Sequence, residues 1–514
     1  MATLIFLIIF SLPILFIFLL IRKNRSPGHP ARRPPGPKGL PFIGNLHQLD
    51  TSKLHLCLTQ LSNKYGPLMY LKLGQVPLIV ISSAEVAKQA LKQNDLVFSG
   101  RPNSTSSKRL SYGHLDIVSS SYNEYWREMR KTVVLHLFTL KQVRSFRDVR
   151  ESEVSRMVAE ITKMTLARSG RAVDLSERVM YYSVNVLCRV AFGKRFDEEK
   201  QLDVLLLELQ KSTMDLFVAD YFAPLGWIDK FSGVDSRLDR VFEKMDSFFE
   251  EIIEEHLSSN RPKSMEGDFL DLLIRLREDT SASVKIDWNN IKAILMVCIF
   301  IFLIITQNIF VGGTDTSAST IVWALTALMK NPSAMKKAQQ EIKTLISNKK
   351  SSINEDDIEK LPYLKAVIKE TMRLYPPLPL LIPKETMEKC TINGYEIEPK
   401  TITFVNVWAI GRDPEYWESP NEFLPERFLN NNNDEKIIDF KGRDFGYIPF
   451  GSGRRSCPGL SLGVAAVEMA LANLLYSFDF ELPRGMSEED VDTDASQGLT
   501  VHKKNPLCVV VKLS

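Results

Sequence analysis

The sequence predicts a mainly α-helical fold with a minor β part. Apolar residues recur every three to four positions over 238–257, as on the buried face of an amphipathic helix. Further helical patterns cover 85–93, 151–168, 317–330, 334–347 and 361–374. The β part is confined to two short apolar runs, 68–73 and 77–81. Residues 101–121, rich in Ser and Gly, are expected to form a loop.

Length and composition allow one large unit with an apolar interior. The chain has 514 residues, of which 44% are hydrophobic. Its net charge of +3 is too close to balance to indicate a nucleic-acid partner. The six cysteines are widely spaced and form no Cys-x-x-Cys pair, which favours a reducing compartment and excludes the usual zinc spacings.

The amino terminus predicts a single-pass membrane anchor over residues 2–21. This run is apolar except for Thr3, Ser11 and Pro13, and it is long enough to span a bilayer as a helix. Basic residues follow it directly and none precedes it, so the positive-inside rule places the rest of the chain in the cytosol. A cleaved secretory signal is the alternative, but such signals begin with basic residues and have a shorter apolar core.

A basic, proline-rich hinge is expected over 22–45, because closely spaced prolines such as Pro34, Pro35 and Pro37 end a helix and stiffen a connector. The remaining residues, 46–514, are expected to form one large folded domain.

The most informative segment is the loop Phe450-Gly-Ser-Gly453-Arg-Arg455-Ser-Cys457-Pro-Gly459, which precedes a helix-forming run. A cysteine binds a metal as thiolate, and neighbouring arginines and a helix amino terminus are expected to lower its pKa. Glycine at 453 and 459 lets the backbone adopt positive φ or approach a flat group closely. A buried structural cysteine is the alternative, but five residue types at set positions recur by chance at fewer than about one in 10⁵ positions.

This pattern, Phe-x-x-Gly-x-Arg-x-Cys-x-Gly, resembles that of the haem-thiolate monooxygenases, the cytochromes P450. The resemblance covers nearly the whole chain and implies the cytochrome P450 fold with haem b as cofactor. It implies that Cys457 binds the iron and that Phe450 and Gly459 lie against the haem. The closest match is to plant microsomal members of specialised metabolism.

Two further elements follow the order of the P450 core. Glu370 and Arg373 share a helix face three residues apart, and Arg427 in Pro-Glu-Arg-Phe is a candidate third partner. An isolated Glu-x-x-Arg pair is common on helix surfaces and indicates little by itself. The resemblance to the family rests on the order of the motifs, in which this pair precedes Pro-Glu-Arg-Phe and then the cysteine loop. By that resemblance the three residues form a structural core behind the haem and do not touch substrate.

Gly312-Gly-Thr-Asp315-Thr316 lies in an apolar helical region. Its polar pair Asp315 and Thr316 is suited to proton delivery, although the same residues also suit a helix N-cap, and the residues alone do not separate the two. The resemblance to the central-helix motif of the family assigns Asp315 and Thr316 as catalytic.

The resemblance also assigns residues to the haem propionates. Trp126 and Arg130, one helical turn apart, and Arg455 are the expected contacts, since the planar fork of Arg suits carboxylates. Lys384 stands where the family usually has Arg or His, which leaves one propionate contact in doubt.

Residues 297–307 (VCIFIFLIITQ) form an insertion. In relatives of this type, the segments that correspond to 291–296 and 308–312 follow one another almost directly. Eleven residues make about three helical turns, or roughly 16 Å, which neighbouring helices would not match. We expect a protrusion or a looped-out bulge that exposes apolar surface, and hypothesise a splicing or gene-model origin or a real insertion that weakens folding. Sequencing of the transcript tests this: abundant message with these codons and a normal haem spectrum would exclude the artefact.

The resemblance implies NADPH- and O₂-dependent monooxygenation of a lipophilic small molecule. The chain has no flavin or dinucleotide motif, so electrons are expected from a separate NADPH-cytochrome reductase in the endoplasmic reticulum membrane. The basic residues Arg127, Lys131 and Arg454 are candidates for its docking, or simply a solvated charged face. The alternatives are a haem-binding membrane protein without turnover, disabled by the 297–307 insertion, and an isomerase or dehydratase, which the Asp315-Thr316 pair disfavours.

Overall fold

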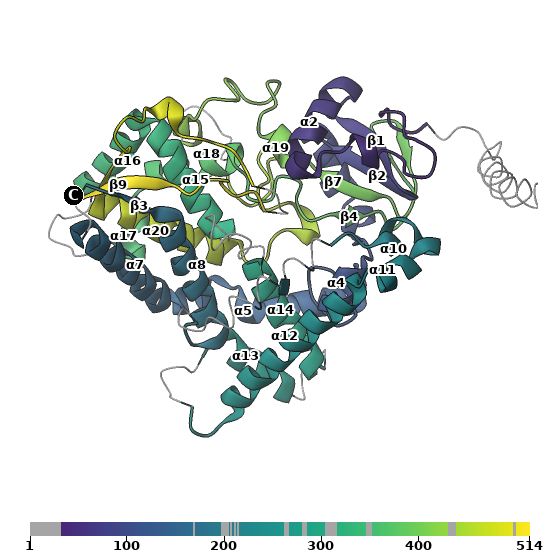
Figure 1. Ribbon diagram of the computed structural model, residues 1–514, viewed down its shortest axis with the longest axis horizontal. Helices are drawn as coiled ribbons and strands as arrows, with labels where there is room; N and C mark the ends of the chain where they lie inside the picture. The colour runs from purple at the N-terminus through teal and green to yellow at the C-terminus, as the bar shows by residue number, and fades with distance from the viewer. Residues whose placement is uncertain are drawn as a thin grey trace, which may run out of the picture.

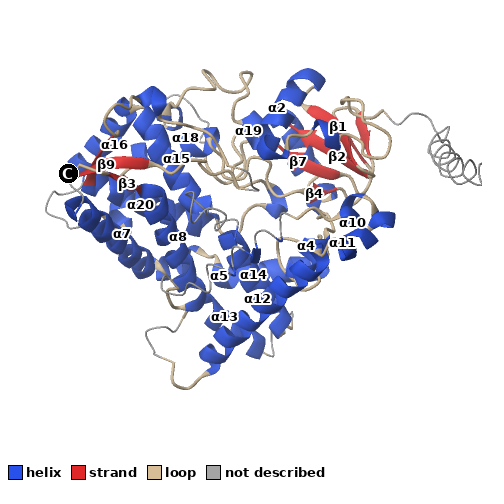
Figure 2. Ribbon diagram, in the orientation of Figure 1, coloured by secondary structure: helices blue, strands red, loops and turns tan. Residues whose placement is uncertain are grey.

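The computed structural model describes residues 32–514 except 168–169, 197–204, 206–207, 210–211, 213–214, 262–266, 280–284, 304–315, 346–351, 430–437 and 497–499, and gives only the backbone of 298–303. A large helical body occupies most of the molecule, and a smaller part built on a β-sheet lies at one side (Figures 1 and 2). The predicted anchor at 2–21 and Asp315 lie outside the described residues.

Helices dominate the described chain, as predicted. They are α2 (Leu54–Tyr65), α3 (Ala84–Lys88), α4 (Thr105–Leu110), α5 (Glu124–Leu137), α6 (Leu140–Ser145), α7 (Arg147–Ala167), α8 (Leu175–Phe192), α10 (Val218–Tyr221), α11 (Trp227–Phe231), α12 (Val234–Leu257), α13 (Phe269–Glu278), α14 (Trp288–Leu303), α15 (Thr316–Lys330), α16 (Pro332–Leu345), α17 (Glu355–Ile358), α18 (Pro362–Leu374), α19 (Val407–Ile410) and α20 (Leu460–Ser477).

The larger sheet joins strands from distant parts of the chain in the order β1-β2-β7-β4. β1 (Leu68–Leu73) pairs antiparallel with β2 (Val76–Ile81), which pairs parallel with β7 (Ile402–Val405). β7 in turn pairs with the two-residue strand β4 (Lys384–Glu385), so this sheet decides where Lys384 lies. The smaller sheets are β3 (Ala172–Asp174), β9 (Cys508–Leu513) and β8 (Phe478–Glu481) in that order, and the pair β5 (Cys390–Ile392) and β6 (Tyr395–Ile397).

The main hydrophobic core lies among α7, α8, α15, α16, α18 and α20. α20 is the helix that follows the cysteine loop, and it packs against α7, α15, α16 and α18. Within the described part of the chain, α20 alone has the length and hydropathy of a membrane span, but more than half of it is buried in protein. We therefore interpret α20 as a core helix.

The sequence-based predictions of the helices and of β1 and β2 are confirmed, with boundaries displaced by a few residues. The prediction of an uninterrupted loop over 101–121 is wrong, because α4 forms within it. The Ser104 side chain caps this helix by accepting a hydrogen bond from the Ser107 N–H. Serine favours loops as well as helix caps, so composition alone did not distinguish this helix from a loop.

The atypical segment 297–307 begins inside α14. This helix runs from Trp288 through Leu303, so the first seven inserted residues continue it, and 304–307 lie outside the described residues. The expected protrusion or bulge stays a prediction.

Candidate functional site

The cysteine loop connects a turn of 3₁₀ helix, Gly453–Arg455, to the start of α20. Gly451 and Gly453 both have left-handed φ, near +70°, which suits glycine. A Cβ on Gly453 would collide with the Asp95 carboxylate and with the Leu91 carbonyl oxygen. The Cys457 N–H donates to the Phe450 carbonyl oxygen at 2.9 Å, which closes the loop.

Cys457 is an exposed residue whose thiol is nevertheless desolvated. The surrounding protein buries the sulfur enough to raise its pKa. Beside it, a Cβ added to Gly459 would meet nothing nearer than Cε1 of Phe138, at 3.7 Å. An exposed residue with a desolvated thiol, beside a glycine that is not crowded, leaves room for a group bound against this loop.

The expected lowering of the Cys457 pKa is wrong for the protein alone. Burial raises the pKa of the thiol, and the Gly459 N–H, the Arg130 charge and the Leu460 N–H lower it without compensating. The predicted electrostatic contributions are therefore present but outweighed. A bound metal ion deprotonates a coordinating thiol outright, so the site fits metal binding without a low intrinsic pKa.

α5 presents Trp126 and Arg130 to the cysteine loop. The Arg130 guanidinium donates to the Ser456 carbonyl oxygen at 2.6 Å, next to Cys457. The Trp126 indole N–H donates to the Ile117 carbonyl oxygen at 2.9 Å, so the protein itself satisfies this donor. A propionate contact for Trp126 stays a prediction.

Arg455 points away from the loop into a group of backbone carbonyls. Its guanidinium donates to the carbonyl oxygens of Ser99 at 2.9 Å and Ser120 at 2.5 Å. Burial, and then the charges of Arg101 and Arg130, lower the pKa of Arg455 to about 8.

Arg101 and Lys384 complete a cation cluster with Arg130 and Arg455. Arg101 donates to the carbonyl oxygens of Val118 at 2.8 Å and Pro383 at 2.7 Å. Burial, opposed by Asp116, lowers the pKa of Arg101 to about 10; burial and then Arg101 lower that of Lys384 well below its usual range.

The cation cluster carries an excess of positive charge, which the nearby carboxylates of Asp95 and Asp116 offset only in part. Arg101, Lys384 and Arg455 are each less than 9% exposed, and no carboxylate of the described residues forms an ion pair with any of them. Buried charges without partners are strongly unfavourable, so a cluster of like sign fits a bound anionic group. The two propionates of haem are such a group.

Sequence reasoning missed Arg101. The residue follows Gly100, which forms an isolated β-bridge with Glu385, the neighbour of Lys384. This pairing spans nearly 300 residues and has no local signature in the sequence. The adjacent Pro102 gave only a loop signal.

α15 begins at Thr316, and its first turn approaches the helix that follows the cysteine loop. A Cβ added to Gly463 of α20 would lie 3.7 Å from Oγ of Ser317. The fold therefore places Thr316 close to the start of α20. Its predicted partner Asp315 lies outside the described residues.

The structure brings Glu370, Arg373 and Arg427 together in a buried network. Arg373 donates to both Glu370 carboxylate oxygens at 2.7 Å, and Arg427 donates to one of them at 3.0 Å. Arg373 also donates to the carbonyl oxygens of Gly411 and Pro420. The network thus holds the segment that leads toward the cysteine loop.

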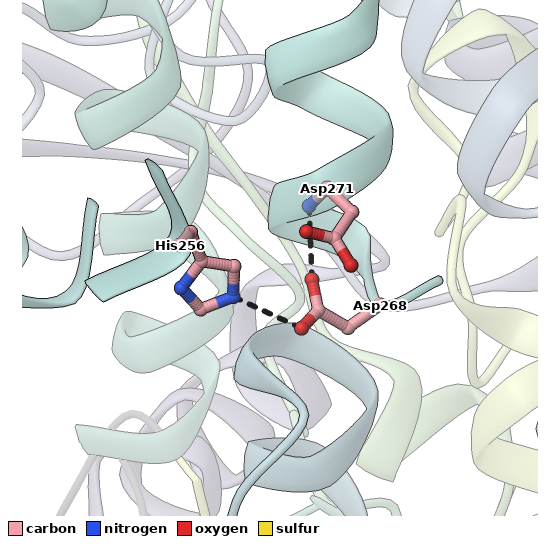
Figure 3. Close-up of side chains that lie close together, drawn as sticks. All are labelled: His256, Asp268 and Asp271. Atoms are coloured by element: carbon pink, nitrogen blue, oxygen red, sulfur yellow. Dashed lines mark hydrogen bonds and ion pairs between the residues drawn. The ribbon is translucent and has the colours of Figure 1, made fainter. Parts of the chain in front are cut away.

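A second cluster of potential ligands lies where α12 ends and α13 begins. Figure 3 shows the His256 ring directed at Asp268, 3.0 Å away, with Asp271 beside it. The guanidinium of Arg261 already pairs with both carboxylates. We interpret the cluster as an ion-pair network that joins the two helices, because a cation already occupies it.

Comparison with known proteins agrees with this geometry. The cytochrome P450 family model matches residues 34–509. The chain is 45% identical to strychnine-11-hydroxylase of Strychnos nux-vomica, over 98% of this chain and 97% of the relative. It is 46% identical, over the same shares, to 5-OH-xanthotoxin synthase of Pastinaca sativa.

Among solved structures, a zebra fish cytochrome P450 with abiraterone superposes with a TM-score of 0.70 at 25% identity, covering 90% of this chain and 99% of that one. The family match over most of the chain, together with relatives this similar over their whole length, establishes the assignment. The chain belongs to the cytochrome P450 family, the haem-dependent monooxygenases.

Proposed function

We propose that this monooxygenase hydroxylates a lipophilic small molecule of plant specialised metabolism at a haem whose iron is bound by the thiolate of Cys457. The observation that carries the proposal is the position of Cys457, an exposed residue that lies next to Arg130 of the cation cluster. A thiolate suits iron, and the unpaired cations suit the two propionates.

Bound haem supplies the activation of O₂, so that one oxygen atom enters the substrate and the other leaves as water. The residues of the chain would hold and orient the haem. Arg101, Arg455 and Lys384 bind the propionates, with Arg130 at the cysteine loop. Thr316 and its neighbour Asp315 pass protons toward the reaction centre.

The class of substrate is supported by the relatives. Their names specify hydroxylation of strychnine, formation of a hydroxylated xanthotoxin and, in a third protein of Pastinaca sativa that is 45% identical, formation of 6,7,8-trihydroxycoumarin. We infer hydroxylation of a comparable plant metabolite.

An exposed apolar patch supports attachment to the endoplasmic reticulum membrane through residues 2–21. Leu40 and Phe42, near the start of the described chain, are half exposed, and Trp227 and Phe231 of α11 are 57% and 85% exposed. The β1–β2 turn lies between these regions, because Gly74 bonds Ile43 and Gln75 bonds Tyr221. Grouped exposed aromatic residues are typical of a membrane-facing surface.

We infer that the electrons come from an NADPH-cytochrome reductase. Arg127 and Lys131 lie exposed on α5, the helix that carries Arg130 to the cysteine loop. Both are close to the acidic Glu128, which reduces the local excess of positive charge. Exposed charges of this kind affect the rate of association more than its strength.

Reconstitution with reductase membranes tests the proposal. We expect a thiolate-type carbon monoxide difference spectrum and NADPH oxidation that rises with a plant metabolite from a panel of coumarins and indole alkaloids. Cys457→Ala should lose the thiolate spectrum. Haem binding without oxygen consumption for any member of the panel would instead support the protein without turnover.

A further inference from the structure

Residues 111–121 form most of the connection between α4 and α5 and run from α12, through the Tyr112–Asp246 bond, to the cation cluster. At its carboxyl end, the Ile117, Val118 and Ser120 carbonyl oxygens accept hydrogen bonds from Trp126, Arg101 and Arg455. The position of this connecting segment therefore affects Trp126 and the cluster cations Arg101 and Arg455.

At its amino end, the connecting segment is held by Tyr112. The Tyr112 hydroxyl donates to Oδ1 of Asp246 at 2.7 Å, and the same oxygen accepts from Nζ of Lys292 at 2.7 Å. Lys292 also bonds the Glu250 carboxylate at 2.9 Å. Because Asp246 lies on α12 and Lys292 on α14, this tyrosine latch (Tyr112, Asp246 and Lys292) joins three elements.

Packing around the tyrosine latch excludes water from one side. The Tyr112 ring makes an edge contact with the Phe242 ring of α12, with 4.9 Å between centroids. Lys292 is only 6% exposed. A hydrogen bond to a charged group gains strength in such surroundings, so the latch restrains more than a surface contact would.

The backbone at the latch is strained. Tyr112, Gly113 and His114 have φ of +53°, +81° and +69° in succession. Left-handed φ is unfavourable for a bulky residue such as Tyr112, and it persists only where surrounding contacts impose it. The Tyr112 hydroxyl bond is one such contact, and its loss should let the segment relax.

The protonation states suit the latch. Burial raises the pKa of Tyr112, so it stays a phenol that donates. The pKa of Lys292 is raised overall, because its bonds to Asp246 and Glu250 outweigh the lowering effect of burial. The side chain therefore remains a charged ammonium.

We propose that Tyr112 is a positioning residue whose hydroxyl, through Asp246 and Lys292, holds residues 111–121 against α12 and α14 and thereby limits entry of bulky ligands to the haem side. Other hydrogen bonds also hold this region: Thr105 of α4 bonds Asp220 of α10, and the Tyr125 hydroxyl links the Leu115 carbonyl oxygen to Asn290 of α14. Loss of the latch alone should therefore loosen the segment without unfolding the protein.

Hydrogen exchange on the full chain, measured with and without added haem, tests the restraint. Tyr112→Phe keeps the ring and removes the hydroxyl. Loss of a hydrogen bond to a charged group predicts roughly 10- to 100-fold faster exchange in 111–121, with unchanged rates in α18 and α20.

Tyr363→Phe is the matched control. The Tyr363 hydroxyl likewise bonds a carboxylate, Glu426, that is shared with a lysine, Lys337, but on α18 and far along the chain from 111–121. It should leave exchange in the segment unchanged. Wild-type exchange of 111–121 in Tyr112→Phe would overturn the proposal.

Entry of ligands gives a second readout. We expect association of the bulky azole clotrimazole with the haem to be about 10-fold faster in Tyr112→Phe, and association of imidazole to be unchanged. This arm rests on the proposed haem site, whereas hydrogen exchange does not, so failure of haem binding would not be mistaken for failure of the latch. Equal clotrimazole rates in both proteins would overturn the role in entry, and a purely structural Tyr112 would lower stability without changing these rates.

Discussion

The guanidinium of Arg455 lies over the Trp126 ring, 4.0 Å from its centroid. This contact joins the cysteine loop to α5, and the Arg455 nitrogen atoms continue to the Ser99 and Ser120 carbonyl oxygens. The hydrogen-bond partners of Arg455 are thus neutral carbonyl groups, and Asp116 and Asp95 offset its charge only in part, which favours a bound anion.

Arg455→Gln should therefore weaken retention of haem. Loss of charge-assisted bonds worth about 1.5–3 kcal/mol predicts roughly 10- to 100-fold faster transfer of haem to an excess of apomyoglobin. Stability of the haem-free protein should change less, since the substitution also removes a buried charge that Asp116 and Asp95 offset only in part. Arg454→Gln is the control, because Arg454 pairs with Asp95; equal transfer rates in the two variants would contradict the account.

Glu370→Ala should destabilise the protein by about 3–5 kcal/mol, because it leaves the buried Arg373 without a carboxylate. Urea unfolding measures this loss. Glu396→Ala removes an exposed pair with Lys389 and should cost far less than Glu370→Ala, because solvent screens such a pair. A similar cost at both sites would show that the buried network is not needed for folding.

The stability of the protein should depend on pH through Glu468 of α20. Burial raises the pKa of Glu468 from 4.5 to about 7, and Lys365 only partly opposes this. The folded state then binds more protons than the unfolded state between these values, so this stabilisation is complete below about pH 4.5 and is lost as pH rises through 7.

Glu468→Gln removes this dependence. The stability of the variant relative to wild type should rise by about 2 kcal/mol between pH 5.5 and pH 8, as judged by urea unfolding. A difference that does not change with pH would exclude Glu468 as the titrating group.

Much of the site follows from local sequence, and the rest depends on long-range pairing. Spacing alone places Glu370 and Arg373 on one helix face, and the loop motif marks Cys457. Arg101 could not be found this way, since the Gly100–Glu385 bridge brings it beside Lys384. The direction of the Cys457 pKa was mispredicted for the same reason, because burial is a tertiary property.

Thr316→Ala should leave substrate binding intact and uncouple oxygen use. Proton delivery supplied by a positioned side chain typically contributes 10²- to 10⁴-fold, so product per NADPH should fall while NADPH oxidation continues. Thr326→Ala is a control on the same helix, where the hydroxyl donates to the Val322 carbonyl oxygen. Unchanged coupling in Thr316→Ala would remove Thr316 from the proposed proton path.

The central claim is coordination of haem iron by the Cys457 sulfur, and the carbon monoxide difference spectrum of the reduced protein tests it most directly. We predict the Soret maximum of a thiolate-ligated haem in the wild-type chain and its loss in Cys457→Ala, with Cys508→Ala, an exposed cysteine of β9, unchanged. A nitrogen-type spectrum, or a thiolate spectrum that survives Cys457→Ala, would contradict the account.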